Sequence, residues 1–381
     1  MGPRPREDEE GVGELNIVEA TNPPRALVSR SARGPLLFVL GSFLLCATVV
    51  LVLPAPTSAL RAYTDHLRNP ACSFVALERG ADIYRRPFGE LFDQSAFKRK
   101  IRLWPQVRYL YPPGALVAFA PMALLGQALP ISDGAYYRAC GLYVLLLTHL
   151  ALWLMLRRLM KLPHGWGIPA MAVAWICCAR SGLSGQFEPL WLAAAVCMLA
   201  AAEEHRTGAA LAWLGLATLL HYRAATLLPF GVAVVVPLLR TSPRRWPWAA
   251  LAFTMLCGAL SLACFLSAVG DAEHEHLITR PGDALFIVDV LVTLAGLGLA
   301  CHARNPYLAL TILAVGAIGM IDPQHWWHAT PVLVPLLARD VGREWEHPGW
   351  MTMSLTAWAV GMQYVWVNRP LELFLDVWRA F

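Results

Sequence analysis

The stretch RYLYPPGALVAFAP, residues 108–121, decides how the rest of the chain is threaded. It resembles the start of a transmembrane helix, but two prolines stand at its beginning and the apolar run behind them is short. Whether residues 112–129 cross a membrane determines the side on which every later loop lies.

Composition places the chain among polytopic helical membrane proteins. Of its 381 residues, 57% are hydrophobic and 15% are charged, against roughly 25% charged residues in soluble domains. Apolar runs near membrane length recur along the chain, and we expect about 11 transmembrane helices. They are predicted at 35–54, 136–156, 166–182, 187–202, 208–222, 224–239, 248–269, 284–301, 307–321, 330–339 and 351–367.

Basic residues in short loops mark the cytoplasmic side. Arg25, Arg30 and Arg33 precede the first run, so the N-terminus is expected in the cytoplasm. If 112–129 crosses, four later basic loops all fall outside. If it is re-entrant or interfacial, all four become cytoplasmic. These loops hold Arg157, Arg158 and Lys161; Arg240, Arg244 and Arg245; His302 and Arg304; and Arg339 and Arg343. We predict a re-entrant or interfacial segment at 111–130, with an ordinary crossing as the alternative.

The expected fold is an all-α membrane domain over 35–367, with a large first outer loop over 55–110 that carries interfacial helices. Residues 1–34 are polar and are expected to be disordered, and 368–381 form a C-terminal tail. The first run is read as a retained helix and not as a signal peptide. The net charge of +5 is a topology signal and does not indicate nucleic-acid binding. Most of the nine cysteines lie in apolar runs, whereas Cys72 is expected in a loop.

This topology gathers the unusual polar groups on the outer face. The first outer loop contains YTDHLR, where Asp65 could accept a proton from a hydroxyl; a solvated loop aspartate is the alternative. In ERGADIYRRP, Arg85 and Arg86 could hold a phosphate. A structural role is favoured for the residues before them, in which Gly80 ends a helix, Asp82 caps one and Tyr84 anchors at the interface.

Three further motifs fall on the same face. His221 and Arg223 of HYR could neutralise a phosphate leaving group, or form a helix-hairpin loop. In DPQHWWH, His325 and His328 share a helical face if the segment is helical, and Trp326 and Trp327 suit a sugar ring or an interfacial belt. The basic, aromatic segment 98–113 suits anionic lipid headgroups or a substrate phosphate.

No metal site and no cofactor are predicted from these motifs. The His pair of DPQHWWH and the stretch DAEHEH at 271–276 are weak metal signals, and dependence on a divalent metal is left open. No P-loop, GxGxxG after a strand, GxSxG or HExxH occurs, which argues against ATP-driven transport and soluble nucleotide-sugar chemistry.

The order of these motifs resembles the GT-C superfamily of membrane glycosyltransferases, above all the α-mannosyltransferases that use polyprenyl-phosphate mannose. The likeness covers about residues 35–240. It rests on an acidic residue early in the first outer loop, G-x-D-x-Y, Y-P-P opening an apolar run that ends in proline, and a later basic residue. The matching positions are Asp65, Gly80–Tyr84, Tyr111–Pro112–Pro113, Pro121, Gly185–Gln186, His221–Arg223 and Pro229.

The resemblance implies inverting transfer of a mannose-like or arabinose-like sugar from a polyprenyl-phosphate donor to a lipid or glycan acceptor. Asp65 would be the base. The donor phosphate would contact His221, Arg223, His325, His328, Arg85 and Arg86. Tyr84, Tyr111, Gln186, Glu188, Trp326 and Trp327 would line the substrate groove. The expected place is a bacterial inner membrane with the site facing the periplasm, and membrane lipids are the other expected partners.

The sequence departs from the family pattern at the expected base. Many relatives carry two acidic residues in this loop, whereas His66 follows Asp65 here. The spacer between Tyr84 and Tyr111 is long and basic. Asp82 and Glu78 are therefore reserve candidates for the base. A transporter or lipid flippase is the main alternative function, although no paired half-sequences are visible, and a non-catalytic membrane scaffold is a third.

Overall fold

The computed structural model describes residues 33–52, 65–97, 108–159, 164–228 and 247–268. Within these ranges all regular secondary structure is helical, so the predicted all-α class is confirmed for this part of the chain. The predicted crossings at 284–301, 307–321, 330–339 and 351–367, and most of the one at 224–239, lie outside the described residues.

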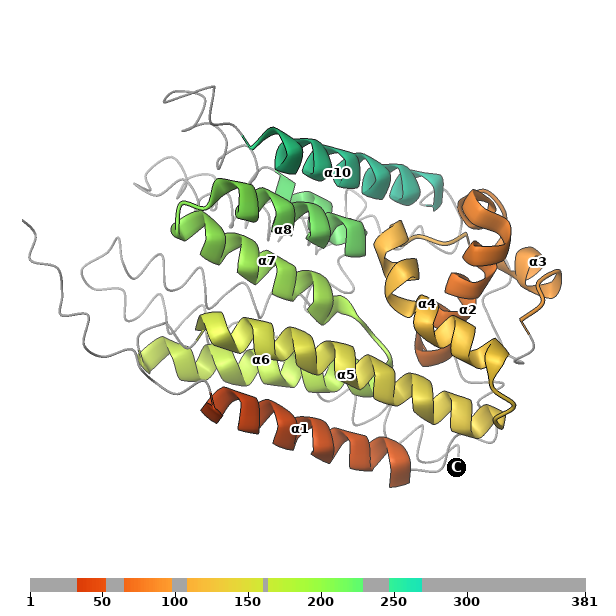
Figure 1. The fold of residues 1–381 in the computed structure, drawn as a ribbon, viewed down its shortest axis with the longest axis horizontal. Coiled ribbons are helices and arrows are strands. Elements are labelled where there is room, and N and C mark those ends of the chain that lie inside the picture. Colours follow the sequence, from red (N-terminus) through yellow and green to blue (C-terminus); the bar gives the residue numbers. More distant parts are fainter. Residues whose placement is uncertain (1–32, 53–64, 98–107, 160–163, 229–246, 269–381) are drawn as a thin grey trace, which may run out of the picture.

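Six helices of the described part coincide with predicted crossings and form its main body (Figure 1). Three of them, α1, α5 and α10, are long and apolar enough to cross a membrane. The six are α1 (Arg33–Val52), α5 (Asp133–Leu159), α6 (His164–Ser184), α7 (Glu188–Glu203), α8 (Thr207–Leu220) and α10 (Trp248–Ala268).

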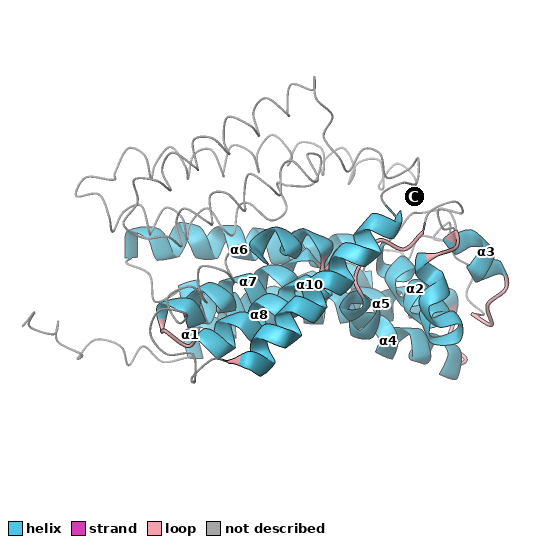
Figure 2. Cartoon of the chain, turned by 90° about the horizontal axis from the view of Figure 1, so that it is seen from above, coloured by secondary structure: helices cyan, strands magenta, loops and turns pink. Residues whose placement is uncertain are grey.

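Helices α1 and α5 run antiparallel, as two contacts at different heights show. Ser42 is hydrogen-bonded to His149, while a Cβ atom at Gly141 would lie 3.0 Å from Val50. Residue numbers therefore rise along α1 as they fall along α5. The last residue of α1 and the first of α5 lie at the same end of the array, which we call the α2 end because α2, α3 and α4 gather there (Figure 2).

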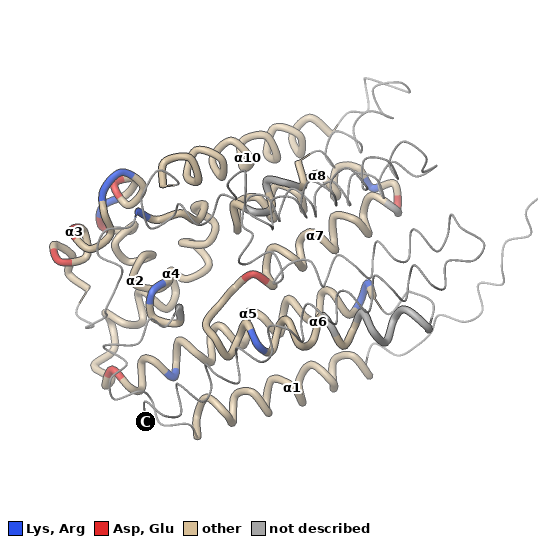
Figure 3. Tube along the Cα trace, turned by 180° about the vertical axis from the view of Figure 1, so that it is seen from behind, with Lys and Arg blue, Asp and Glu red and all other residues tan. Residues whose placement is uncertain are grey.

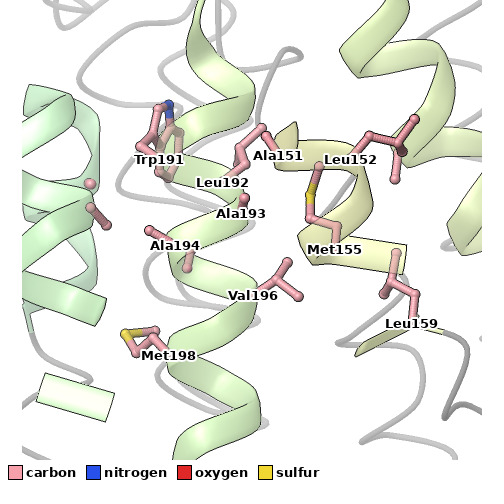
Figure 4. Close-up of a cluster of buried hydrophobic side chains, with 14 of the residues drawn as sticks. Ala151, Leu152, Met155, Leu159, Trp191, Leu192, Ala193, Ala194, Val196 and Met198 are labelled. Carbon is pink, nitrogen blue, oxygen red and sulfur yellow. The ribbon is translucent and has the colours of Figure 1, made fainter. Parts of the chain in front are cut away.

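Helix α7 is the centre of the main hydrophobic core. A helix that is apolar on all sides is stable only when it is surrounded, and Trp191 to Met198 are all at most 3% exposed. Three consecutive alanines at 193–195 allow neighbouring helices to approach closely. Figure 4 shows this cluster between α7 and α5, where Met155 lies on the side of α5 that faces Leu192 and Val196.

The described part of 55–110, the predicted first outer loop with interfacial helices, is helical. Helix α2 (Asp65–Arg79) is followed by the 3-10 helix η2 (Gly80–Tyr84) and by α3 (Phe88–Asp93). Gly80 ends α2 with a φ of +57°, as predicted. The prediction that Cys72 lies in a loop is wrong. Cys72 is 3% exposed inside α2, because α2 presents an apolar face at Leu67, Ala71 and Val75 that packs in a second core cluster.

The segment opened by the two prolines is a single helix, α4 (Pro113–Ala128). Pro112 is extended and Pro113 occupies the first helical turn, where the missing N–H has no intrahelical partner to lose. The proline pair therefore starts the helix. Helix α4 packs against α2, α5 and α8 at the α2 end. Its position relative to a membrane stays a prediction.

Helices α8 and α10 run parallel. A Cβ at Gly208 would touch Pro247 at 3.4 Å, and farther along Thr254 Oγ1 donates to the carbonyl of Leu211 at 2.6 Å. Helix α8 ends at Leu220, two residues before the predicted boundary, and the 3-10 helix η3 (Tyr222–Leu227) follows. The HYR motif therefore lies at a break in the helix, close to the end of α10.

Candidate functional site

The start of α2 is fastened to the turn between α6 and α7. Nε2 of His66 lies 3.1 Å from the carbonyl oxygen of Gly182. Gly185 has a φ of +82°, and a Cβ there would lie 2.4 Å from the backbone nitrogen of His66. The backbone of Asp65, the first residue of α2, therefore lies next to this turn. Its side chain lies outside the described part of the structure.

The α6–α7 turn is compact and internally hydrogen-bonded. The N–H of Gln186 donates to the carbonyl of Ser181 at 2.8 Å, and that of Gly185 donates to Gly182 at 3.4 Å. Ser184 Oγ also donates to Ser181 at 3.2 Å. This arrangement requires a left-handed residue at 185, where glycine carries no steric cost.

Glu188, predicted to line the groove, is the first residue of α7. Its side chain is buried, at 6% exposure. The unpaired N–H groups of the first helical turn favour a negative charge there. Arg180 on α6 interacts electrostatically with the same carboxylate. The α6–α7 turn therefore carries a buried acid with a cation beside it.

His221 stands at the end of α8 and is completely buried. Its ring centroid lies 4.6 Å from that of Tyr222, 5.0 Å from Tyr111, 5.8 Å from Phe187 and 5.9 Å from Trp191. These rings come from the segment before α4, from α7 and from η3. Because aromatic rings enclose the imidazole, a phosphate reaches it only if those side chains separate.

A chain of aromatic contacts links this cluster to η2. Tyr84 lies 6.0 Å from Tyr109 between ring centroids, and Tyr109 lies 5.6 Å from Tyr111. The N–H of Tyr109 donates to the carbonyl of Ile83 at 3.1 Å. Burial raises the pKa values of Tyr84 and Tyr109, so both phenols are protonated near neutral pH. Two predicted groove residues, Tyr84 and Tyr111, and the predicted phosphate ligand His221 thus belong to one connected group.

Two predicted phosphate ligands lie apart from this group. Arg86 forms an exposed ion pair at 3.2 Å with Glu90 of α3, and Arg85, which directly follows η2, is exposed. Of the two reserve candidates for the base, Glu78 and Asp82, the first has a structural role. Both carboxylate oxygens of Glu78 accept the N–H of Ala96, at 3.1 and 3.2 Å. The predicted cap at Asp82 is wrong, because η2 begins without a side-chain cap.

Other predicted residues are described in part or fall outside the described ranges. Arg223 lies in η3, one residue after Tyr222 of the aromatic cluster, but its side chain is outside the described part. His325, Trp326, Trp327 and His328 are entirely outside it. Among the described residues, no group of three or more His, Cys, Asp and Glu side chains has metal-binding geometry.

Sequence reasoning missed two residues of the site. His66 was noted only as a departure from the family pattern. Arg180 was not singled out, although a lone arginine in an apolar run is a signal for a functional position in membrane proteins. Figure 3 shows why this signal is useful: charged positions concentrate at the two ends of the helical array, and few lie between them.

Comparisons with known proteins give no match. The sequence matches no protein-family model. No curated protein sequence and no solved structure matches it either.

Proposed function

We propose that the protein is an inverting glycosyltransferase of GT-C type. It moves a sugar from a polyprenyl-phosphate donor to a lipid or glycan acceptor on the outer face of a bacterial inner membrane. One observation carries the proposal: the start of α2 with Asp65, the α6–α7 turn with Gln186 and Glu188, and HYR at the end of α8 meet at one end of the array. These segments are separated widely in sequence.

The proposed reaction needs a base on one side of the sugar and cations on the other. The Asp65 carboxylate removes the proton from the acceptor hydroxyl, whose oxygen bonds to the anomeric carbon of the sugar. The bond from that carbon to the phosphate oxygen breaks, and polyprenyl phosphate leaves with the electron pair. Arg223 stabilises the departing phosphate, and His221 contributes if its aromatic surroundings open.

The proposed topology has eleven crossings, with α4 re-entrant or interfacial. One observation supports it. Helices α1 and α5 run antiparallel, with Ser42 beside His149 and Val50 beside Gly141, so the intervening α2, α3 and α4 return the chain to the end from which they started.

The test is sugar transfer from a polyprenyl-phosphate-linked donor by the full-length protein in proteoliposomes. We expect Asp65→Asn to lower kcat at least 100-fold while expression and thermal stability are kept. Asp93→Asn is the matched control, because Asp93 is an exposed aspartate at the end of α3 in the same loop. Full activity of Asp65→Asn contradicts its role as the base. Transmembrane movement of the donor without sugar transfer would identify a flippase instead.

A further inference from the structure

We infer that His66 is a positioning residue that holds the first turn of α2, and so Asp65, against the α6–α7 turn. The inference rests on the proposed function, because the residue that His66 holds in place is the proposed base, Asp65. It concerns a residue that the family pattern does not assign, at the position where the sequence departs from that pattern.

The hydrogen bond fixes the tautomer of the imidazole. A backbone carbonyl only accepts, so the ring nitrogen 3.1 Å from Gly182, Nε2, carries the hydrogen and donates it. Among the described residues, Nδ1 has no hydrogen-bond partner. Protonation of Nδ1 would therefore place an uncompensated N–H in a buried position, and burial lowers the pKa of His66 to about 4. The ring is neutral at physiological pH.

Contacts on several sides hold the ring in place. The side chain is 4% exposed. Its ring meets that of Tyr137 edge to face, with centroids 5.5 Å apart. A Cβ at Gly185 would lie 2.9 Å from Nδ1, and one at Gly141 would lie 3.7 Å from Cδ2. His66 is thus enclosed by α5 and by the α6–α7 turn, which leaves it positioned to orient a neighbour and not to contact a substrate.

The neighbour that it orients is Asp65. Consecutive Cα atoms are about 3.8 Å apart across a trans peptide, so fixing His66 on the α6–α7 turn also fixes the backbone of Asp65 relative to Gln186 and Glu188. A general base must stand within hydrogen-bond reach of the proton that it removes. A displacement of about 1 Å can lower the rate by about 100-fold. Loss of the His66 anchor therefore acts on catalysis through Asp65.

Two substitutions separate the hydrogen bond from the packing. His66→Phe keeps a planar ring but removes the donor, whereas the amide of His66→Gln can still donate to Gly182. We expect His66→Phe to lower kcat 10- to 100-fold with KM for the donor changed less than twofold, and His66→Gln to stay within about threefold of the wild type. His149→Phe is the matched control, because His149 is buried but bonds Ser42 of α1 and the carbonyl of Leu145 and makes no hydrogen bond to Gly182; it is expected to lower thermal stability without this loss of kcat.

A second readout does not depend on sugar transfer. Asp65→Cys and Gln186→Cys are combined with Cys301→Ser, because the other eight cysteines are buried and Cys301 lies outside the described residues. A short bifunctional thiol reagent then reports whether positions 65 and 186 stay adjacent. We expect cross-linking to fall at least fivefold when His66→Phe is added and to recover with His66→Gln. Equal cross-linking in all three proteins overturns the inference. The same cross-linking pattern, together with a wild-type protein that transfers no sugar, would overturn the proposed function alone.

Discussion

The hydroxyl of Ser42 lies 2.9 Å from Nε2 of His149, across the interface between α1 and α5. Nδ1 of the same histidine lies 2.8 Å from the carbonyl oxygen of Leu145, so Nδ1 carries the hydrogen and Nε2 accepts from Ser42. The Nε1–H of Trp175 in turn donates to the Ser42 hydroxyl at 2.7 Å. One serine thus connects α1, α5 and α6 in their middle sections.

This network predicts a stability cost for Ser42→Ala. The change leaves Trp175 and His149 with unmatched polar atoms in a buried position, which costs about 1 to 2 kcal/mol. Thr48→Ala is the matched control on the same helix, because the exposed Thr48 hydroxyl only donates to the carbonyl of Leu44 at 2.8 Å. Thermal unfolding in detergent measures both. Equal melting temperatures for the two variants contradict the role of the network.

Close packing of α4 on α8 predicts that Gly114→Ala is disruptive. A Cβ at Gly114 would lie 2.5 Å from the carbonyl oxygen of Leu219, and backbone atoms cannot yield as a flexible side chain does. We expect a loss of about 1 to 3 kcal/mol in unfolding free energy, as for other overpacked sites. Gly41→Ala is the control, because a Cβ at Gly41 meets nothing within 4 Å. An unaffected Gly114→Ala would contradict the packing.

The proline in α4 predicts a coupling with Tyr143. Pro121 lies inside the helix and removes the backbone hydrogen bond to the carbonyl of Val117, and the Tyr143 hydroxyl donates at 2.6 Å to the next carbonyl, that of Ala118. We expect Tyr143→Phe to cost about 1 kcal/mol and to cost less when Pro121→Ala is present. A double-mutant cycle measures the difference, and simple additivity would refute the coupling.

The buried imidazole of His66 predicts loss of stability in acid. Burial lowers its pKa from 6.5 to about 4 in the folded protein. Between these two values the unfolded chain binds more protons, so the unfolding free energy falls as pH decreases, by about 3 kcal/mol across the window. Above pH 6.5, His66 does not make the unfolding free energy depend on pH.

Unfolding of His66→Phe at pH 7.5, 6, 5 and 4 tests this expectation. The variant should lose that part of the pH dependence. His205→Asn is the control, because His205 is exposed and has a φ of 55°, a conformation that asparagine tolerates. An unchanged slope in His66→Phe would show that other groups cause the acid sensitivity.

The proposed topology predicts where residues just after α5 lie. A reporter fused after Lys161 should give a cytoplasmic signal, because α4 does not add a crossing. The matched fusion after Gly134, at the start of α5, should report the outer side. An external signal after Lys161 means that residues 112–129 cross the membrane.

The sequence predicts the long helices well because membrane-length apolar runs have few alternatives to helix. Runs at 136–156 and 187–202 correspond to α5 and α7 within a few residues. Helix α2 was harder to foresee, because Pro70 and several charged residues interrupt its apolar face. Its burial depends on α4, and no local pattern shows that partner.

The contacts of the site could not be predicted in the same way. His66 and Gly182 are 116 positions apart, and Ser42 and His149 are 107 apart. Both pairs consist of residue types that occur in many roles, and only the folded arrangement brings them together. By contrast, Pro112 and Pro113 were already informative in the sequence, because an adjacent proline pair suits the first turn of a helix.

Helix α4 is attached at both ends to different helices. Gly114 rests on the last turn of α8, and near the other end Gly126 rests on Tyr136 in the first turn of α5. Any motion that widens the distance between those two helix ends must change the shape of α4. Pro121, where one backbone hydrogen bond is already missing, is the position at which α4 is expected to bend.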